Sequence, residues 1–263
     1  MEERADPKEE PMFIRMLGPH YPAPEGELRI ISHRGGRGFG PENTLESLRN
    51  ALEAGVKMVE TDIRETADGV LVIHHNPMAN SKFIKDYEAA ELRQVHPAIP
   101  TLQEYLETAF GRCHLDLEAK LLDIHVLART VAEFSRPDQV MITSFNSSLL
   151  VALKEEYPDF KVGWVLRLHH EKEGAMELAV KSGMQLLLPR QGLVDEDFVA
   201  QAHREGLLVY TWTVNHPTTL RGLVGQGIDG VITDKYQLMS ETWEELRNPA
   251  SQLADTPVTE ALS

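Results

Sequence analysis

Three acidic residues with regular spacing are the first candidates for chemistry in this sequence. Glu60 and Asp62 stand two positions apart in an apolar segment, and Glu118 closes a second segment of the same kind, HLDLE. Because side chains alternate between the two faces of a strand, Glu60 and Asp62 share one face. Carboxylates that meet at one place repel one another unless a proton or a cation intervenes. The pattern therefore predicts a site for one hard divalent ion, Mg²⁺ or Ca²⁺, held by Glu60, Asp62 and Glu118.

Salt bridges are the alternative explanation for these acids. Arg34 and Lys120 are available as partners, and pairing would explain any one acid by itself. Three acids at the ends of otherwise apolar segments favour the metal site instead. The sequence has no HExxH motif and no other close His/Cys spacing, which argues against a zinc hydrolase. It also lacks GxSxG, so a serine nucleophile would be without its usual turn.

Two histidines at strand ends are the candidates for acid and base catalysis. His33 ends the segment LRIISH and His75 ends VLVIHH. An unperturbed imidazole titrates at about pH 6.5, which suits both roles. His74 and His75 are adjacent, so only one of them can face the site. We expect His75 to face inward, and we interpret the other histidines near strand ends as structural: His74, His114, His169 and His170.

Short apolar segments alternate with helical patterns along most of the chain. We interpret nine segments as strands: 28–33, 57–63, 70–75, 113–118, 139–145, 161–166, 185–189, 207–214 and 229–233. The clearest helical patterns cover 43–55, 123–135, 147–158 and 194–206, and Asn43 is the predicted N-cap of the first. Repeated alternation of strand and helix predicts a parallel sheet with right-handed crossovers.

The nine strand candidates are compatible with a barrel of eight. The link RETADG between 57–63 and 70–75 is too short for a parallel crossover, and its Asp-Gly marks a tight turn. We therefore predict an α/β fold: a single (β/α)8 TIM barrel with a short hairpin-like arm after the second strand. The alternative is an open doubly wound sheet, which expects GxGxxG running into a helix after the first strand. HRGGRGFGPENT has the glycines but places a proline and a helix cap there.

Composition excludes several classes of protein. The 263 residues carry a net charge of −15 and contain one cysteine, so a disulfide framework within the chain and a CxxC site are excluded. The chain has no basic runs, which argues against nucleic acid as a partner. No apolar run approaches the ~18 residues of a spanning helix, so stable membrane insertion is not expected. The N-terminus lacks the pattern of a secretory signal, and we expect a cytoplasmic location.

The excess negative charge is concentrated at the two ends. Residues 1–27 are acidic and rich in proline, residues 241–263 are acidic, and together they carry more than half of the net charge. We predict three parts: an N-terminal extension over 1–27, a barrel domain over 28–240 and a C-terminal tail over 241–263. In a TIM barrel the C-terminal ends of the strands build the active site, where the acids and both candidate histidines are expected to meet.

Seven motifs in this order resemble the glycerophosphodiester phosphodiesterase family, over about residues 29–236. They are HRGGRGFGPENT at 33–44, ETDIRETADGVLVIHHNP at 60–77, IPTLQEYL at 99–106, LDLEAK at 115–120, SF at 144–145, YTWTVN at 210–215 and GIDGVITDK at 227–235. The resemblance implies a TIM barrel with one divalent metal. It also implies hydrolysis of a small-molecule glycerophosphodiester to glycerol 3-phosphate and an alcohol.

The resemblance also implies roles for individual residues. His33 and His75 match the family's acid/base histidines, and the three acids match its metal ligands. Arg34 would meet the phosphate, and Lys120 matches the lysine of the family's E-x-K motif. Two positions keep two explanations each: Trp212 as an apolar wall for substrate or as barrel packing, and Asn43 as a metal ligand or as a helix cap.

Two departures from the family pattern leave the substrate open. Asn76 stands where the family usually has Asp, and the segment from His75 to 99, which often forms a cap, is short. The main prediction is hydrolysis of glycerophosphodiesters. The alternatives are a lysophospholipase D-like enzyme acting on lysophospholipids, and a catalytically weakened barrel that binds a phosphorylated ligand. The sequence leaves open the leaving alcohol, the oligomeric state, and whether water or the adjacent glycerol hydroxyl attacks.

Overall fold

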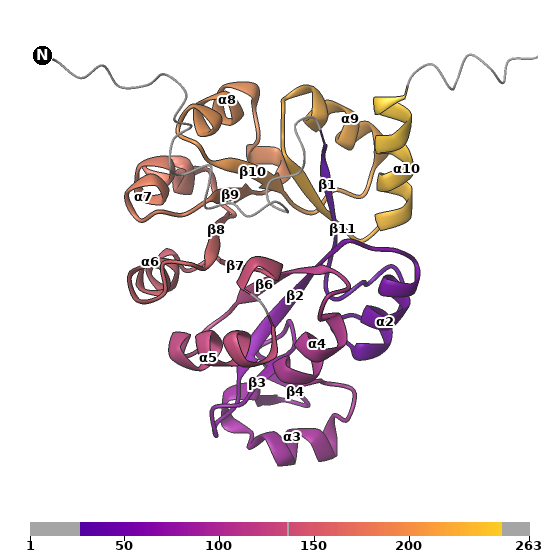
Figure 1. The fold of residues 1–263 in the computed structure, drawn as a ribbon, viewed down its shortest axis with the longest axis vertical. Helices are drawn as coiled ribbons and strands as arrows, with labels where there is room; N and C mark the ends of the chain where they lie inside the picture. Colours follow the sequence, from indigo (N-terminus) through magenta and orange to yellow (C-terminus); the bar gives the residue numbers. More distant parts are fainter. Residues whose placement is uncertain (1–26, 136, 249–263) are drawn as a thin grey trace, which may run out of the picture.

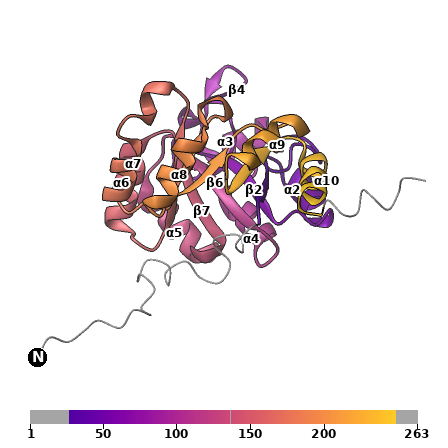
Figure 2. The ribbon, with the colours of Figure 1, turned by 90° about the horizontal axis from the view of Figure 1, so that it is seen from above.

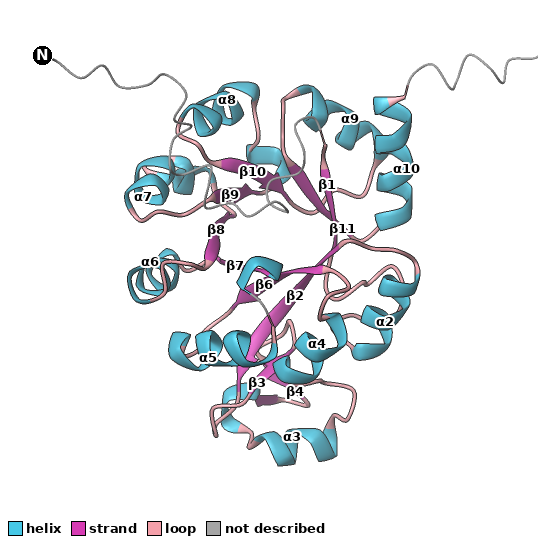
Figure 3. Cartoon of the chain, viewed as in Figure 1, coloured by secondary structure: helices cyan, strands magenta, loops and turns pink. Residues whose placement is uncertain are grey.

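The structure, a computed structural model, describes residues 27–135 and 137–248, and its strands form a closed barrel inside a ring of helices (Figures 1 and 3). Eight parallel strands of the described chain pair in the order β1, β11, β10, β9, β8, β7, β6, β2, and a β1–β2 pairing closes the ring. These strands are β1 Arg29–Ser32, β2 Met58–Glu65, β6 His114–Ala119, β7 Val140–Ser144, β8 Lys161–Leu166, β9 Leu186–Pro189, β10 Leu208–Thr211 and β11 Gly230–Thr233. The predicted TIM barrel is confirmed, and closure excludes the open doubly wound sheet.

Helices follow the barrel strands along the chain and lie outside the barrel (Figure 1). They are α2 Leu45–Glu53, α4 Leu102–Ala109, α5 Ile124–Phe134, α6 Ser147–Glu156, α7 Ala175–Lys181, α8 Glu196–Arg204, α9 Pro217–Gly225 and α10 Tyr236–Arg247, with the 3₁₀ turns η2 Pro137–Gln139, η3 His169–Lys172 and η4 Gln191–Leu193. The four predicted helices correspond to α2, α5, α6 and α8. Within the described ranges, no helix combines the length and apolar character needed to cross a bilayer.

The proposed division of the chain differs from the structure at its C-terminal boundary. Helix α10 continues to Arg247, past the expected start of the tail at 241, and buries Met239 and Thr242. The N-terminal extension to residue 26 and the tail from 249 lie outside the described residues, and both remain predictions.

Two apolar layers hold the barrel together. Alternate strand residues point inward and form an interior cluster that includes Ile31, Met58 and Tyr210. The strand residues on the opposite face, such as Leu115 and Leu117, pack outward against the helices in a larger cluster. Both faces of the strands are covered, which explains why their sequences are almost continuously apolar. An acidic side chain at an inward position therefore interrupts the filling of the barrel.

The predicted arm follows β2 and is confirmed. β3 (Leu71–Ile73) pairs antiparallel with the end of β2. A second small hairpin, β4 (Met78–Ala79) with β5 (Lys82–Phe83), then leads through η1 (Ile84–Asp86) to α3 (Ala89–Val95). This segment has a core of its own, built from Val72, Ala79, Ile84, Tyr87 and Leu92. In Figure 2, β4 protrudes beyond the body of the barrel.

Candidate active site

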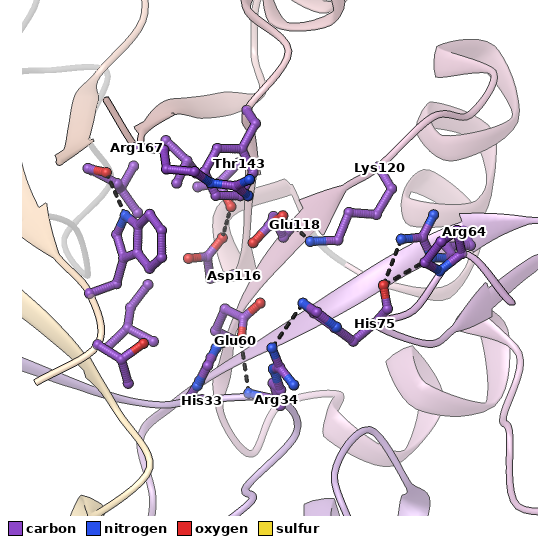
Figure 4. A pocket seen from close by; sticks show the side chains of 17 residues that line it. His33, Arg34, Glu60, Arg64, His75, Asp116, Glu118, Lys120, Thr143 and Arg167 are labelled. Carbon is purple, nitrogen blue, oxygen red and sulfur yellow. Dashed lines mark hydrogen bonds and ion pairs between the residues drawn. The ribbon is translucent and has the colours of Figure 1, made fainter. Parts of the chain in front are cut away.

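A pocket of about 320 Å³ lies at the C-terminal ends of the barrel strands (Figure 4). Its walls come from residues at or directly after the strand ends, including His33 and Arg34 after β1, Lys120 after β6 and Trp212 after β10. The arm contributes His75 and Pro77. All eight site residues predicted from the sequence lie in this pocket or directly contact a residue that lines it: His33, Arg34, Glu60, Asp62, His75, Glu118, Lys120 and Trp212.

The three predicted metal ligands form one acid cluster, consisting of Glu60, Asp62 and Glu118. The parallel pairing of β2 with β6 sets Asp62 directly beside Glu118 and Glu60 beside Asp116. One oxygen from each member of the acid cluster lies within 4.8 Å of the others. Because Glu60 and Asp62 lie two and four positions after the inward Met58, they share its face of β2 and point into the barrel mouth.

The charges of the acid cluster are poorly balanced without a cation. Burial, together with the charges of Asp62 and Glu118, raises the pKa of Glu60 well above its usual value. Its Oε1 atom is buried and accepts no hydrogen bond from the described residues. Its Oε2 atom accepts a hydrogen bond from the backbone N–H of Arg34 at 2.8 Å. Glu60 therefore has a free, buried oxygen directed at a site that favours positive charge.

Lys120 supplies part of the missing positive charge. Its Nζ atom lies 2.6 Å from Oδ1 of Asp62 and also contacts Oε1 of Glu118. Burial opposes the charge of this ammonium group, but the two carboxylates outweigh burial and raise the pKa of Lys120. Burial likewise disfavours the charged form of Asp62, yet Lys120 and Asn43 hold its pKa below the usual value.

Asn43 corrects one prediction. The N-cap of α2 is Thr44, whose hydroxyl accepts a hydrogen bond from the N–H of Ser47, whereas Asn43 is buried one residue earlier with φ of 58°. The Nδ2 atom of Asn43 donates to Oδ2 of Asp62 at 2.9 Å, and its Oδ1 accepts from Thr61 at 2.7 Å. The capping pattern misled the prediction because Asn and Thr are both good caps and stand side by side. Asn43 orients a carboxylate of the acid cluster.

Each candidate histidine has a polar partner on one ring nitrogen. The Nδ1 atom of His33 lies 2.7 Å from Oδ1 of Asp234, and its Nε2 lies 3.8 Å from Glu60. Asp234 is itself held by Asn215, whose Nδ2 donates to Oδ2 at 2.8 Å. The hydrogen bond from His33 is the largest cause of a lowered Asp234 pKa of about 2. This lowered pKa keeps the carboxylate beside His33 charged at neutral pH.

His75 has a different environment. Its Nε2 atom accepts a hydrogen bond from Nη2 of Arg34 at 2.8 Å, since a guanidinium group can only donate. The proton of the neutral ring therefore sits on Nδ1, which donates to Oδ1 of Asn76 at 3.2 Å. Burial, with the charges of Arg34 and Lys120, lowers the pKa of His75. The neighbouring His74 does not line the pocket, and its Nε2 faces the carbonyl of Met78 instead.

The opposite wall of the pocket is apolar. Trp212 donates its indole N–H to the carbonyl of Leu188 at 2.8 Å, and its ring meets Phe145 edge-on with centroids 5.5 Å apart. The guanidinium of Arg167, which also lines the pocket, lies over the Phe145 ring, 4.3 Å from its centroid. Trp212 therefore packs in the barrel wall and also lines the pocket, and its contact with substrate remains a prediction.

Three charged residues that line the pocket, and Asp234 beside His33, were not singled out from the sequence. Asp116 is fully buried, its Oδ1 accepts from Thr143 at 2.6 Å, and burial raises its pKa to about 8. It shares a strand face with Glu118, so alternation was the available signal. Asp234 lies inside the motif GIDGVITDK, and Arg64 inside ETDIRE. Nothing in the sequence marks Arg167.

Comparison with known proteins agrees with this geometry. The model of the Glycerophosphoryl diester phosphodiesterase family matches residues 33–238, well over half of the chain. The chain belongs to this family. The matched segment of the glycerophosphoryl diester phosphodiesterase family contains every predicted site residue. The family prediction made from the motifs is therefore confirmed.

Relatives and solved structures of the same family cover most of the chain. A glycerophosphodiester phosphodiesterase of Caldanaerobacter subterraneus subsp. tengcongensis is 26% identical over 228 residues, which is 78% of this chain and 93% of the relative. A putative glycerophosphoryl diester phosphodiesterase from Silicibacter pomeroyi has a TM-score of 0.76 at 27% identity, covering 84% of this chain and 94% of that one. A phosphodiesterase from Oleispira antarctica, solved with the product sn-glycerol-3-phosphate, has a TM-score of 0.77 at 27% identity, covering 82% and 96%.

Proposed function

We propose that this chain hydrolyses glycerophosphodiesters to glycerol 3-phosphate and an alcohol, with one bound Mg²⁺ or Ca²⁺ ion. One observation carries the proposal: a single pocket gathers three carboxylates, two imidazoles from different elements and the cations Arg34 and Lys120. Membership of the family supports the reaction, and the structural likeness to a phosphodiesterase in complex with sn-glycerol-3-phosphate supports the product.

The acid cluster fits a divalent cation. Its members offer only oxygen atoms, which hard ions prefer, and Oε1 of Glu60 is buried without a partner. A cation held by Glu60, Asp62 and Glu118 would polarise a phosphoryl oxygen and offset the negative charge that develops on it. Arg34 and Lys120 add fixed positive charge for the same phosphate.

His75 is suited to act as the general base. Its neutral form carries the proton on Nδ1, which leaves the Nε2 lone pair on the pocket side, and burial keeps its pKa low. When substrate draws Arg34 to the phosphate, Nε2 becomes free to accept a proton from the attacking hydroxyl group, of water or of the glycerol itself.

His33 is suited to act as the general acid. Asp234 accepts a hydrogen bond from Nδ1 of His33 and fixes the orientation of the ring, as a carboxylate does in other acid/base pairs. The proton on Nε2 then points into the pocket, where it can be given to the departing alkoxide oxygen. The two histidines thus differ in partner, and this difference separates their roles.

The apolar wall contributes to binding. Trp212 and Phe145 cover carbon atoms of the glycerol or the leaving group, while the polar side of the pocket holds the phosphate. The cytoplasmic location and the absence of a nucleic-acid partner remain predictions of the sequence.

The test is hydrolysis of glycerophosphoglycerol, glycerophosphoethanolamine and glycerophosphocholine by the full chain, followed by detection of glycerol 3-phosphate. Turnover that a chelator abolishes and Mg²⁺ or Ca²⁺ restores is the expected result. Absence of turnover of every diester with metal present would contradict the proposal and favour a barrel that only binds a phosphorylated ligand.

A second candidate, lysophospholipase D-like activity, is favoured by the surroundings of the pocket. Three exposed apolar side chains directly follow pocket residues in the chain: Met78, Leu121 and Leu168, which are 38%, 77% and 49% exposed. Apolar side chains around a pocket mouth suit a substrate that carries an acyl chain. Serine at Leu121 and Leu168 together should lower turnover of a lysophospholipid while leaving glycerophosphoglycerol turnover unchanged. Equal turnover of the lysophospholipid by both proteins would remove this candidate.

A further inference from the structure

Four cationic side chains line the pocket, and the charged groups of three of them form ion pairs or hydrogen bonds within the protein. Arg34 is bound by a carboxylate and an imidazole. Lys120 is bound by two carboxylates of the acid cluster. Arg64 donates two hydrogen bonds to a main-chain carbonyl oxygen, at 2.6 and 3.1 Å. The fourth cation, Arg167, therefore stands apart.

Arg167 is exposed at the pocket mouth and is held in place without an opposite charge. Its guanidinium stacks 4.3 Å from the Phe145 centroid. Within residues 27–135 and 137–248, no carboxylate forms an ion pair with it. Glu171, four residues further along the chain, uses its Oε2 atom to accept from the backbone N–H groups of Arg167 and Leu168, at 2.6 Å each. The turn after β8 is thereby fixed, and the N–H groups at the edge of the guanidinium stay available to a ligand.

The position of Arg167 determines which part of a bound substrate its charge can reach. In Figure 4 it lies on the side of the pocket opposite to His33 and Arg34. Phe145 stands between the two halves of the site, because its centroid is 4.3 Å from the Arg167 guanidinium and 5.8 Å from Nζ of Lys120. A phosphodiester bound at the acid cluster would have to extend across this ring to reach Arg167.

The wall beside Arg167 carries no acidic side chain that could pair with a positively charged group. Phe145, which follows β7, begins this wall. The rest of the wall consists of Val165 on β8, Leu188 on β9, Ile232 on β11, and Trp212 and Thr213 after β10. None of these side chains is acidic. An ammonium group in this half of the pocket would meet the charge of Arg167 with no carboxylate to offset it, whereas an anion would meet an unpaired guanidinium.

We propose that Arg167, stacked on Phe145, forms an anion subsite that selects substrates carrying a second negative charge beyond the scissile phosphate, such as a second phosphodiester. The proposal rests on the proposed function and narrows its substrate class. Substrates with a quaternary ammonium group in place of the anion are disfavoured by the same charge. Because Arg167 is exposed, the preference weakens as ionic strength rises.

The test compares two substrates that differ in the charge of the group beyond the scissile phosphate. The anionic substrate is 1,3-bis(sn-glycero-3-phospho)glycerol and the cationic one is glycerophosphocholine. Arg167→Gln removes the charge at the subsite, and Arg49→Gln, at an exposed position on α2 outside the pocket, removes the same charge elsewhere. We expect Arg167→Gln to lower kcat/KM for the anionic substrate by about tenfold, which is the effect of removing one steering charge. The same variant should leave kcat/KM for glycerophosphocholine unchanged or raise it. Arg49→Gln should change neither by more than about twofold.

Two outcomes would overturn the proposal. An equal loss with both substrates would assign Arg167 to the scissile phosphate, and no loss with either would leave it without a role in binding. Failure of the proposed function has a different signature, since the unaltered protein would then turn over neither diester. In that case calorimetry can still measure the affinity of bis(glycerophospho)glycerol for the protein. An affinity that falls about tenfold in Arg167→Gln and not in Arg49→Gln supports the anion subsite, and equal affinities contradict it.

Discussion

His33 and Asp234 are 201 residues apart in sequence, yet Nδ1 of the histidine lies 2.7 Å from Oδ1 of the aspartate. Each directly follows its strand, and the preceding residues, Ser32 of β1 and Thr233 of β11, are register partners in the parallel pairing of those strands. Closure of the barrel therefore assembles this pair. Asn215 holds the other carboxylate oxygen and also accepts from the backbone N–H of Asp234 at 2.9 Å.

Asp234→Asn should lower kcat by roughly 10²- to 10⁴-fold with little change in KM, because an amide does not hold the His33 ring in the orientation and tautomer that a general acid needs. Metal affinity should stay unchanged, since Asp234 is not part of the acid cluster. Asp195→Asn, at the N-cap of α8, is the matched control. A loss of metal binding together with kcat would show that the substitution disturbs the whole pocket.

Metal binding should release protons, because the pKa of Glu60 is raised by burial and by its acidic neighbours. Below that raised pKa the cation must displace a proton, so the apparent affinity for Mg²⁺ or Ca²⁺ should weaken as pH falls. An acid with a raised folded-state pKa also costs stability as pH rises above its unfolded pKa, so the metal-free protein should lose stability as pH rises from there to the raised pKa, and metal should restore it. Titration calorimetry in buffers of different ionisation enthalpy measures the released protons. Glu60→Gln should reduce both the release and the affinity, while the exposed Glu53→Gln should change neither.

Gly163 on β8 tests how tightly the barrel is filled. A methyl group at this position would lie 2.6 Å from a side-chain carbon of Leu188 and 2.7 Å from one of Leu186. Gly163→Ala should therefore lower the free energy of unfolding by about 1–3 kcal/mol, the usual cost of overpacking a core. Gly222→Ala, in α9 where no atom lies within 4 Å, should instead stabilise by roughly 0.5–1 kcal/mol. Urea titrations of both variants measure the difference, and equal midpoints would contradict the packing argument.

The sequence was sufficient for the barrel and the acid cluster because both follow from alternation. Period-two spacing put Glu60 and Asp62 on one face, and the pairing of β2 with β6 then brought Glu118 to them. Alternation along a strand could not predict the partners of the histidines. Asp234 reaches His33 only through closure of the ring, and Arg167 reaches Phe145 only through the turn after β8. Asn43 was misinterpreted because local capping preferences cannot distinguish it from Thr44, while its tertiary contact with Asp62 can.

The adjacent histidines of the arm provide a matched pair of variants. His75 lines the pocket with Nε2 against Arg34, and His74 turns toward the carbonyl of Met78. His75→Asn should lower kcat by roughly 10²- to 10⁴-fold, the range for removal of a general base. His74→Asn removes the same group one residue away and should lower kcat less than tenfold. Steady-state kinetics of both variants decide the assignment, and the reverse order of effects would make His74 the base.

Asn76→Asp should move the acidic limb of the pH profile of kcat/KM to higher pH. Asn76 accepts from Nδ1 of His75 at 3.2 Å, and burial is the largest cause that keeps the pKa of this histidine low. A carboxylate in place of the amide would favour the imidazolium form, which raises the pKa of His75. Because the base must be unprotonated, activity would then appear only at a correspondingly higher pH. Asn80→Asp, which adds the same charge at an exposed position of the arm, should leave the limb in place. A limb that stays fixed or moves to lower pH in Asn76→Asp would mean that His75 is not the group whose deprotonation activates the enzyme.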